Sequence, residues 1–264
     1  MSPLPNSLQS LRFIRLGTGG FGAGPRLRLV HRLVRAHLAN RGKTATSFGE
    51  QLVLIEAVLR IPREMPGAIA EFGCYKGMSS VALSLAAKLT GRRLLVFDSF
   101  EGLPEPGAGI HHLGTHQRLD YKKGDYAGSL EDVRTLIARH GEIACCEFVR
   151  GFFADTLKLR PPDETYALIF EDADLVASVA DVLRHAWPKL ADGGLFFSHE
   201  ARDLEVVKLF FDDAHWSSTH GTLAPGLVGA GLGLPIDGMK QAAFAFAGKK
   251  SKGSCLGYTV KRRP

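Results

Sequence analysis

The sequence predicts an α/β protein built on one mainly parallel sheet of seven strands. Short apolar segments typical of strands alternate with longer segments of helical spacing through the middle of the chain, which is the pattern of a parallel sheet covered by helices on both faces. The segment AIAEFGCYKGMSSVALSLAAKL passes from a strand through Gly73 and Gly77 into a helix. Near the C-terminus, the short turn GKKSKGS joins two strands, and so short a connection requires an antiparallel hairpin.

The expected elements follow from spacing and from punctuation by glycine, proline and capping residues. Ser47 with Glu50 three residues later is a capping-box pattern, and Ser129 precedes another helical run. Strands are expected over 69–73, 93–98, 145–149, 166–171, 195–198, 241–247 and 255–261. Helices are expected over 26–40, 47–59, 78–90, 130–140, 175–190 and 203–213, with long loops over 99–128 and 214–239.

The first 60 residues are interpreted as a basic helical cap or lid, and residues 61–264 as the main domain. The first 49 residues contain no Asp or Glu and carry a charge of +8, although the whole chain has a net charge of +6. Apolar residues recur at Leu27, Val30, Val34 and Leu38, so we expect a helix whose arginines stay solvated. Anionic membrane binding and an organelle transit peptide remain alternatives, and no nucleic-acid partner is expected because no such motif accompanies the charge.

Composition favours a soluble globular protein rather than a membrane or disulfide-stapled one. The chain has 264 residues, of which 45% are hydrophobic and 23% charged. No apolar run approaches the ~20 residues that span a bilayer, and the N-terminus lacks a secretory pattern. The four cysteines form no C-x-x-C pair, which is typical of reduced thiols. A cytoplasmic location is therefore expected.

The two strand ends around Glu71 and Asp98 predict an adenosine-type cofactor. Ligands of open α/β sheets bind at the carboxyl ends of the strands, where the turn from Glu71 to Gly77 lies. Asp98 ends the next strand, 27 residues after Glu71, and an acidic residue there can accept hydrogen bonds from ribose hydroxyls. The Walker and G-x-G-x-x-G patterns are absent. Because Glu71 would repel a pyrophosphate and suits an ammonium, S-adenosylmethionine is favoured over NAD.

Further motifs resemble those of the macrocin O-methyltransferase family, whose members methylate sugar hydroxyls of antibiotics. The run FDSFEGLP, from Phe97 to Pro104, carries the most specific resemblance. The segments AEFGCYKGMSS, GFFADTL, FEDADL and LADGGLFFSHE are similar to its other motifs, in order, over roughly residues 50–213. The resemblance implies a Rossmann-like class I methyltransferase fold, a small-molecule acceptor such as a sugar, and S-adenosylmethionine as cofactor.

The resemblance also implies site residues. The expected cofactor-binding residues are Glu71, Gly73, Tyr75, Gly77, Ser79, Ser80, Asp98, Ser99, Gly151 and Phe152. The family's divalent cation, usually magnesium, is held by an Asp and a following Asp-Asp pair, which correspond here to Asp172, His199 and Glu200. The pair is His-Glu in this chain, and imidazole suits manganese or zinc better than magnesium. The metal is therefore expected to differ or to be absent.

Asp172 and His199 are the expected catalytic residues. A sugar hydroxyl is a poor nucleophile, so a base must take its proton or a cation must lower its pKa. Either Asp172 or His199 could be that base, and His199 could act without a metal. His111, His112 and His116 are expected in a lid facing the acceptor, together with the loop 221–235. A non-catalytic or metal-independent S-adenosylmethionine-binding protein, an NAD-dependent oxidoreductase and a homo-oligomer remain open alternatives.

Overall fold

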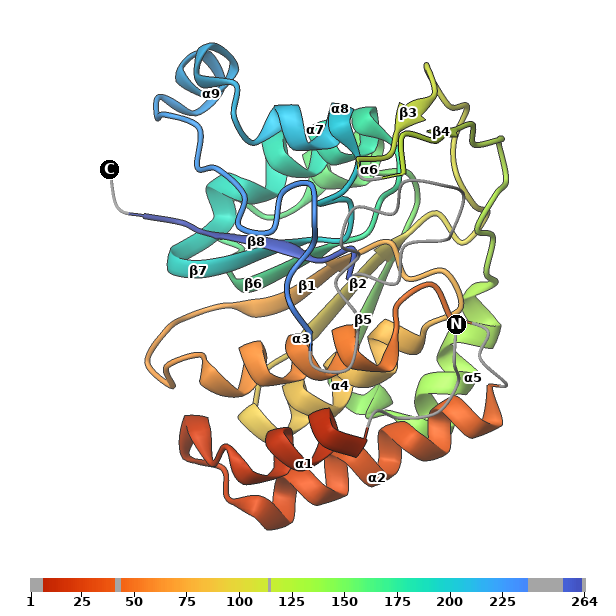
Figure 1. Cartoon of the computed structure of the whole chain (residues 1–264), viewed down its shortest axis with the longest axis vertical. Coiled ribbons are helices and arrows are strands. Elements are labelled where there is room, and N and C mark those ends of the chain that lie inside the picture. The colour runs from red at the N-terminus through yellow and green to blue at the C-terminus, as the bar shows by residue number, and fades with distance from the viewer. Residues whose placement is uncertain (1–6, 41–43, 114, 237–253, 263–264) are drawn as a thin grey trace.

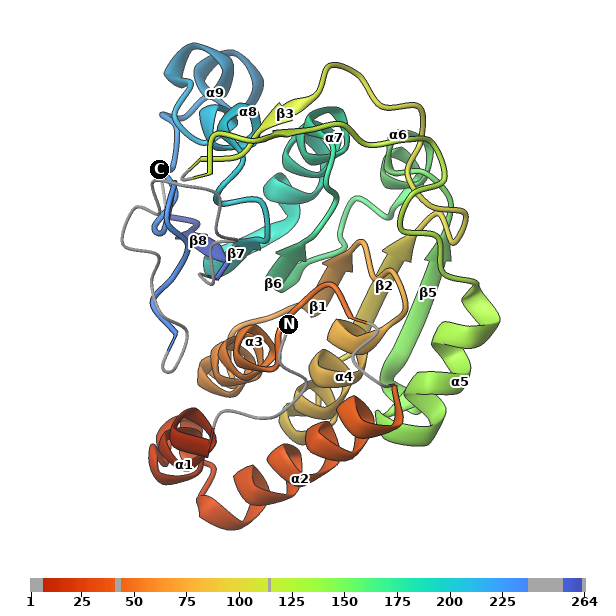
Figure 2. The ribbon, with the colours of Figure 1, turned by 45° about the vertical axis from the view of Figure 1, so that its right-hand side comes forward.

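The parallel α/β architecture is confirmed by a computed structural model, which describes residues 7–40, 44–113, 115–236 and 254–262. Six described strands form one sheet in the order β5-β2-β1-β6-β7-β8, visible edge-on in Figure 2. All neighbouring pairs are parallel except β7 and β8. The strands are β1 (Ala68–Phe72), β2 (Leu94–Asp98), β5 (Cys146–Arg150), β6 (Tyr166–Glu171), β7 (Leu190–Ser198) and β8 (Gly257–Val260).

The strand order places the ends of β1, β2 and β6 side by side. Glu71 pairs with Val96 of β2 on one side and with Phe170 of β6 on the other. From β1 the chain continues outward to β2 and β5, and after returning to β6 it continues outward the other way to β7 and β8. The strands β1 and β6 therefore flank the point where the strand order reverses. That point is where open α/β sheets bind their ligands. The predicted strand 241–247 lies outside the described residues.

Helices of the N-terminal half cover one face of the sheet (Figure 1). They are α1 (Ser7–Arg15), α2 (Ala23–Ala39), α3 (Phe48–Arg60), α4 (Met78–Thr90) and α5 (Leu130–His140). The helices α3 and α4 pack against each other, and α2 packs on α1, α4 and α5. Their apolar side chains share one core with that face of the sheet. The predicted capping box is present at the start of α3, and Ser129 caps α5.

The face of α2 that packs inward differs from the predicted stripe. Leu27 and Leu38 are 55% and 59% exposed, whereas Arg26 is fully buried. The buried positions of α2 are Arg26, Leu29, Val30, Leu33, Ala36 and His37. The expectation that all the arginines of this helix stay solvated is therefore wrong, because Arg26 finds an ion-pair partner inside, in Glu56 of α3.

Helices of the C-terminal half cover the opposite face of the sheet around a second core. They are α6 (Phe153–Thr156), α7 (Val176–Ala186), α8 (Leu204–Leu209) and α9 (Asp213–His220). The expected helix 175–190 ends earlier, at a 3-10 turn containing Pro188, and β7 begins at Leu190. The expected helix 203–213 is shorter, and α9 occupies the start of the expected loop, with Asp212 as its cap.

The long loop after β2 is an arm with a short hairpin, β3 (Ile110–His111) and β4 (Arg118–Leu119). It docks on the segment after β7, where His112 forms a β-bridge with Asp203 and the Leu113 amide donates to the Arg202 carbonyl at 2.6 Å. This docking carries residues 115–126 over the carboxyl edge of the sheet (Figure 2).

Two further observations bear on the expected organisation. Among the described residues up to position 60, only Thr44 and Ala45, in the segment after α2, line the cavity at the carboxyl edge, so the described helices of this segment lie away from it. The division at residue 60 and a lid function stay predictions. Within the part of the chain that the structure describes, no helix is long and apolar enough to cross a bilayer.

Candidate active site

A cavity of about 760 Å³ opens at the carboxyl edge of the sheet. Its size is within the range of small-molecule and cofactor sites. Six of the ten residues predicted to bind the cofactor line it: Gly73, Tyr75, Asp98, Ser99, Gly151 and Phe152. Asp172, His199 and Glu200 line it as well. The topology therefore brings the predicted cofactor residues and the predicted metal ligands into one cavity.

Backbone strain concentrates at this cavity. Among the described residues, five non-glycine residues have positive φ, and Tyr75, Tyr126 and Asp174 of these line the cavity. Gly73 also has a positive φ of 89°, and a Cβ there would lie 1.9 Å from the Asp172 carbonyl oxygen. Glycine is thus required for the ends of β1 and β6 to approach closely. Strain of this kind is typical of functional sites.

Asp98 organises the glycine turn as well as facing the cavity. Its Oδ2 accepts hydrogen bonds from the amides of Cys74 (2.7 Å) and Tyr75 (3.3 Å), and its Oδ1 accepts one from Phe100 (2.7 Å). A carboxylate offers about four lone-pair sites, so three backbone donors leave roughly one for a ribose hydroxyl. The expectation that Asp98 would accept from both ribose hydroxyls is therefore too generous for this arrangement.

Glu71 does not lie where the sequence argument expected it, beside a ligand amine. Its side chain is fully buried and outside the cavity lining. Its Oε2 accepts a hydrogen bond from the Ser80 hydroxyl at the start of α4. Burial, with the charges of Asp172 and Asp98 adding to it, raises the pKa of Glu71 to about 8. The carboxyl group thus serves as a neutral link between β1 and α4.

The other residues of this turn that were predicted to bind the cofactor also lie outside the cavity lining. Gly77 has a φ of 81° and caps α4, where it packs against Val133. Ser79 lines only a small adjoining recess, with Tyr75 and Asp172. A direct ligand contact of Gly77, Ser79 and Ser80 stays a prediction.

Asp172, His199 and Glu200 converge as the alignment with the family implied. They follow the ends of β6 and β7, and one ligand atom from each lies within 4.8 Å of the others. His199 Nδ1 is 3.1 Å from Asp172 Oδ1. Glu200 is almost completely buried; its Oε1 accepts from the Asp174 amide (3.1 Å) and its Oε2 from the Ser198 hydroxyl (3.1 Å).

Acidic groups outnumber cationic ones around this triad. Burial and mutual repulsion raise the pKa values of Glu200 and Asp174 well above their usual range, and that of Glu171 to about 7. Burial also raises the pKa of Asp203 to about 6. Carboxyl groups crowded in this way repel one another when they are ionised, and a divalent cation would relieve that repulsion.

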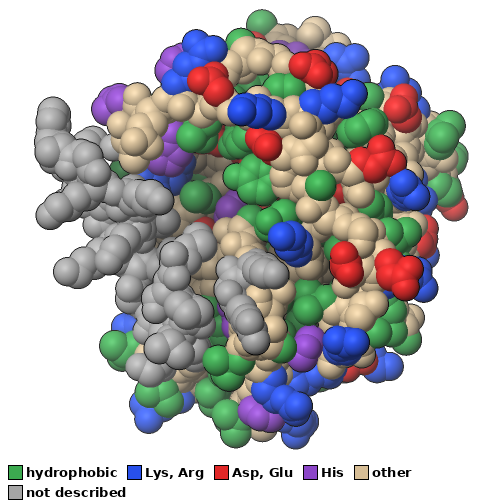
Figure 3. All heavy atoms as spheres, turned by 90° about the vertical axis from the view of Figure 1, so that its right-hand side faces the viewer, with side chains coloured by type: hydrophobic (Ala, Val, Ile, Leu, Met, Phe, Trp, Pro, Cys, Tyr) green, Lys and Arg blue, Asp and Glu red, His purple; other side chains and the backbone are tan. Residues whose placement is uncertain are grey.

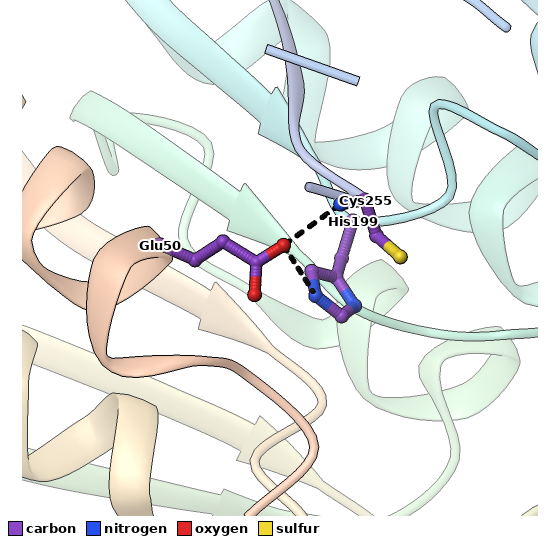
Figure 4. Close-up of side chains that lie close together, drawn as sticks. All are labelled: Glu50, His199 and Cys255. Atoms are coloured by element: carbon purple, nitrogen blue, oxygen red, sulfur yellow. Dashed lines mark hydrogen bonds and ion pairs between the residues drawn. The ribbon is translucent and has the colours of Figure 1, made fainter. Parts of the chain in front are cut away.

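His199 has a second carboxylate partner that the sequence analysis missed. Figure 4 shows Glu50 of α3 directed at the ring, and its Oε1 lies 3.6 Å from His199 Nε2. Glu50, His199 and Cys255 also form a second group of close ligand atoms. Burial alone would lower the pKa of His199, but the charges of Asp172 and Glu50 outweigh burial and hold it well above 6.5. From the capping-box pattern alone, Glu50 was expected only to stabilise the start of α3.

The arm after β2 contributes an aromatic wall. Tyr121 and Tyr126 line the cavity with Tyr75 of the glycine turn, and their rings meet edge to face. Burial and the nearby charge of Asp174 raise the pKa of Tyr126 to about 12. No spacing pattern in the sequence predicted that these tyrosines would line the cavity, because the docking of the arm determines their position.

The expected lid elements are only partly at the cavity. Of the three loop histidines, His112 lines it, whereas His111 pairs with Glu205 at 2.8 Å and His116 does not line it. No residue of 221–235 lines it either; Gly231 and Leu234 donate instead to the carbonyls of Ala201 and Leu256. The expectation that this loop faces the acceptor is therefore wrong, since it packs beside β8.

These features define a protein with the class I methyltransferase fold, as comparison with solved structures also shows. The O-methyltransferase NovP superposes with a TM-score of 0.63 at 19% identity, covering 90% of this chain and all of that one. The calicheamicin methyltransferase CalS11 gives a TM-score of 0.51 at 16% identity, covering 91% and 94%. Residues 50–215, more than half of the chain, match the family model for macrocin O-methyltransferase (TylF). The chain belongs to the macrocin O-methyltransferase family.

Two curated relatives show similarity over part of their length. The 8-demethyl-8-(2,3-dimethoxy-alpha-L-rhamnosyl)-tetracenomycin-C 4'-O-methyltransferase of Streptomyces olivaceus is 37% identical over 134 residues, which are 49% of this chain and 51% of the relative. The mycinamicin III 3''-O-methyltransferase of Micromonospora griseorubida is 30% identical over 146 residues, 53% and 56% of the two chains. The chain thus matches about half the length of these relatives.

Proposed function

We propose that this protein is an S-adenosylmethionine-dependent O-methyltransferase that acts on a hydroxyl of a small molecule, a sugar carried by a natural product. The observation that carries the proposal is the shared cavity, in which Asp98 at the end of β2 and the Asp172–His199–Glu200 triad face the same space. Membership of the macrocin O-methyltransferase family supports it, and both curated relatives are named as O-methyltransferases. These names give no support to the NAD-dependent alternative.

The residues present fit S-adenosylmethionine. Asp98 has acceptor capacity left for a ribose hydroxyl, and Gly73, Ser99 and Phe152 leave open space beside it. Bound there, the cofactor supplies an electrophilic methyl group, which the acceptor oxygen takes while it loses its proton. Because this displacement is in line, the chain's main contribution is to hold the two reactants in the right geometry. We infer that the tyrosine wall packs against the acceptor.

Replacing Asp98 by Ala should weaken binding of S-adenosylhomocysteine, the demethylated product. The change removes a ribose acceptor and leaves the amides of Cys74, Tyr75 and Phe100 without their partner. Lost hydrogen bonds to a charged group are worth on the order of 1–3 kcal/mol, so affinity should fall roughly 10- to 100-fold. Titration calorimetry measures the change, with the exposed Asp163→Ala as control. Equal affinity of Asp98→Ala and the unchanged protein would refute the cofactor assignment.

The proton of the acceptor hydroxyl goes, in this proposal, to Asp172. In a metal-free site, the charges of Asp172 and Glu50 hold the pKa of His199 well above its usual range, which disfavours the metal-free base considered from the sequence. Asp172 is 13% exposed and therefore accessible from the cavity. A divalent cation held by Asp172, His199 and Glu200 would lower the pKa of the acceptor hydroxyl, and its binding would displace the ring proton. One nitrogen and two oxygen ligands suit manganese or zinc.

Substitution of His199 by Asp tests this metal site. The change restores the family's oxygen ligand, so a metal-dependent enzyme should keep activity and shift its preference from manganese or zinc toward magnesium. Activity is measured after EDTA treatment and re-addition of each ion. If the unchanged protein keeps full turnover in EDTA, the cation is not needed.

A metal-independent S-adenosylmethionine-binding protein is the second candidate. The observation that favours it is the ion pairing of His199 with two carboxylates, Asp172 and Glu50. An imidazolium held between the two carboxylates can take the place of a cation. The EDTA arm of the same experiment separates the two candidates. A cytoplasmic location and a homo-oligomer stay predictions.

A further inference from the structure

We propose that Glu50 is a positioning residue for His199, holding the imidazole so that Nδ1 faces Asp172 and the cavity. The inference rests on the proposed function in one respect, the assignment of His199 to the site. It gives Glu50, a residue of helix α3, a role at the candidate active site, whereas the sequence pattern explained this residue by helix capping alone.

The Glu50 carboxylate is itself held rigidly. Its Oε2 accepts the Ser47 amide at 2.7 Å, which completes the capping box of α3. Its Oε1 accepts the Cys255 amide at 2.7 Å and the Ser254 hydroxyl at 3.2 Å. The residue is 1% exposed. Three donors from two distant parts of the chain therefore fix the direction in which this carboxylate points. Figure 4 shows its contact with Cys255.

His199 presents one ring nitrogen to each of two carboxylates. Nδ1 lies 3.1 Å from Asp172 Oδ1, and Nε2 lies 3.6 Å from Glu50 Oε1, an ion-pair distance slightly longer than a hydrogen bond. Among the described residues, Nε2 has no hydrogen-bond partner. Glu50 is thus the group toward which an Nε2 proton is attracted. With a cation bound, that proton would stay on Nε2 and the Nδ1 lone pair would be directed at the Asp172–Glu200 side.

This arrangement matches the carboxylates that orient metal-binding histidines from behind. Such a partner fixes the tautomer and the ring orientation, and its loss costs about 10- to 100-fold in metal affinity or activity. Capping accounts for only one Glu50 oxygen. The other, Oε1, links the ring to the segment that enters β8. Glu50 Oε1 already accepts two hydrogen bonds. The geometry therefore favours a role of Glu50 in orienting His199 over direct binding of a metal ion by Glu50 together with the Cys255 thiol.

The test compares Glu50→Gln with two matched variants in the full chain. Glutamine keeps the volume and can still complete a capping box, but it removes the charge facing Nε2. Ser47→Ala weakens the cap and Ser254→Ala removes one anchor, and both leave the Glu50 charge in place. The measurements are thermal unfolding, calorimetry with S-adenosylhomocysteine, electron paramagnetic resonance of Mn²⁺, and long-range ¹⁵N–¹H spectra of the histidine rings, assigned with His199→Asn.

Glu50→Gln should shift the His199 ring nitrogen resonances, weaken Mn²⁺ binding about 10- to 100-fold and leave S-adenosylhomocysteine affinity unchanged. Ser47→Ala should lower the melting temperature without moving the ring resonances. Ring resonances and Mn²⁺ affinity in Glu50→Gln equal to those of the unchanged protein would overturn the proposal. A sulfur-to-cobalt charge-transfer band in the Co²⁺-loaded protein that Cys255→Ser abolishes would overturn it in favour of direct ligation. If the unchanged protein binds neither cofactor product nor Mn²⁺, the proposed function fails, and the ring spectra alone still decide the role of Glu50.

Discussion

Replacement of Asp172 by Asn should reduce turnover roughly 10²- to 10⁴-fold, the usual worth of a positioned general base. The substitution keeps the shape of the side chain but removes the charge that faces His199 Nδ1 at 3.1 Å. It removes the proposed proton acceptor and one proposed metal ligand together, so the effect should exceed that of any other single change at the cavity. The measurement is the rate of methyl transfer to a glycosylated acceptor on which the unchanged protein turns over.

The control is Asp155→Asn, an identical change at an exposed position of α6 that does not line the cavity. Its turnover should equal that of the unchanged protein. Asp172→Asn should also bind S-adenosylhomocysteine with nearly normal affinity, because Asp98 and the glycine turn are intact. Full turnover in Asp172→Asn would show that neither the base nor the metal ligand is correctly assigned.

Replacement of Arg26 by Met should destabilise the fold by about 3–5 kcal/mol, the usual effect of removing one partner of a buried ion pair. The Arg26 guanidinium is fully buried, pairs with Glu56, and donates to the carbonyls of Phe13 (3.0 Å) and Phe21 (3.1 Å). It also lies 4.8 Å from the Phe13 ring centre. Methionine fills a similar volume but leaves Glu56 and both carbonyls without these donors.

Thermal and denaturant unfolding measure this loss, and Arg28→Met is the matched control because Arg28 is exposed on the same helix. A loss of this size corresponds to roughly 6–20 °C in melting temperature for a chain of this length. Equal stability of the two variants would mean that the Arg26 network adds nothing. Truncation of residues 1–45 is a less clean test of a lid, since it would expose the core shared by α1, α2 and α4.

The basic character of the N-terminal segment is therefore partly structural. Arg26 forms an ion pair with Glu56, and Arg32 forms one with Glu142, which follows the end of α5. On the face shown in Figure 3, Asp and Glu side chains alternate with Lys and Arg over the upper and right-hand parts, whereas Lys and Arg predominate along the lower edge. The two ion pairs support the interpretation of the segment as a covering layer of the domain.

The strand ends that carry the site residues, and their order along the chain, could largely be predicted from the sequence. Strand ends can be located by short apolar runs followed by glycine or acidic residues, and the parallel topology requires their carboxyl ends to share an edge. This reasoning, with the family resemblance, placed Gly73, Asp98, Asp172, His199 and Glu200 in one region, and the structure brings all five to one cavity. The capping residues Ser47 and Ser129 were likewise readable because their effect is local.

Other assignments failed where a side chain's partner lies far away in the chain. The prediction for α2 assumed that every arginine side chain faces water. Arg26 is buried instead, because it forms an ion pair with Glu56, which lies 30 residues away in the chain. Glu71 was expected to face the ligand, yet alternation along β1 and the nearby Ser80 turn it toward α4. Both outcomes depend on which groups meet after packing.

Local periodicity and short motifs were enough to predict the sheet, its glycine turn, the acidic residue at the end of β2 and the family to which the chain belongs. Tertiary packing sets how many acceptor sites Asp98 has left, which tyrosines line the cavity, and the approach of Glu50 to His199 across 149 positions of the chain. These contacts could not be predicted because hydrogen bonding and charge pairing depend on distance in space. Positions so far apart in sequence carry no periodic signal of their contact.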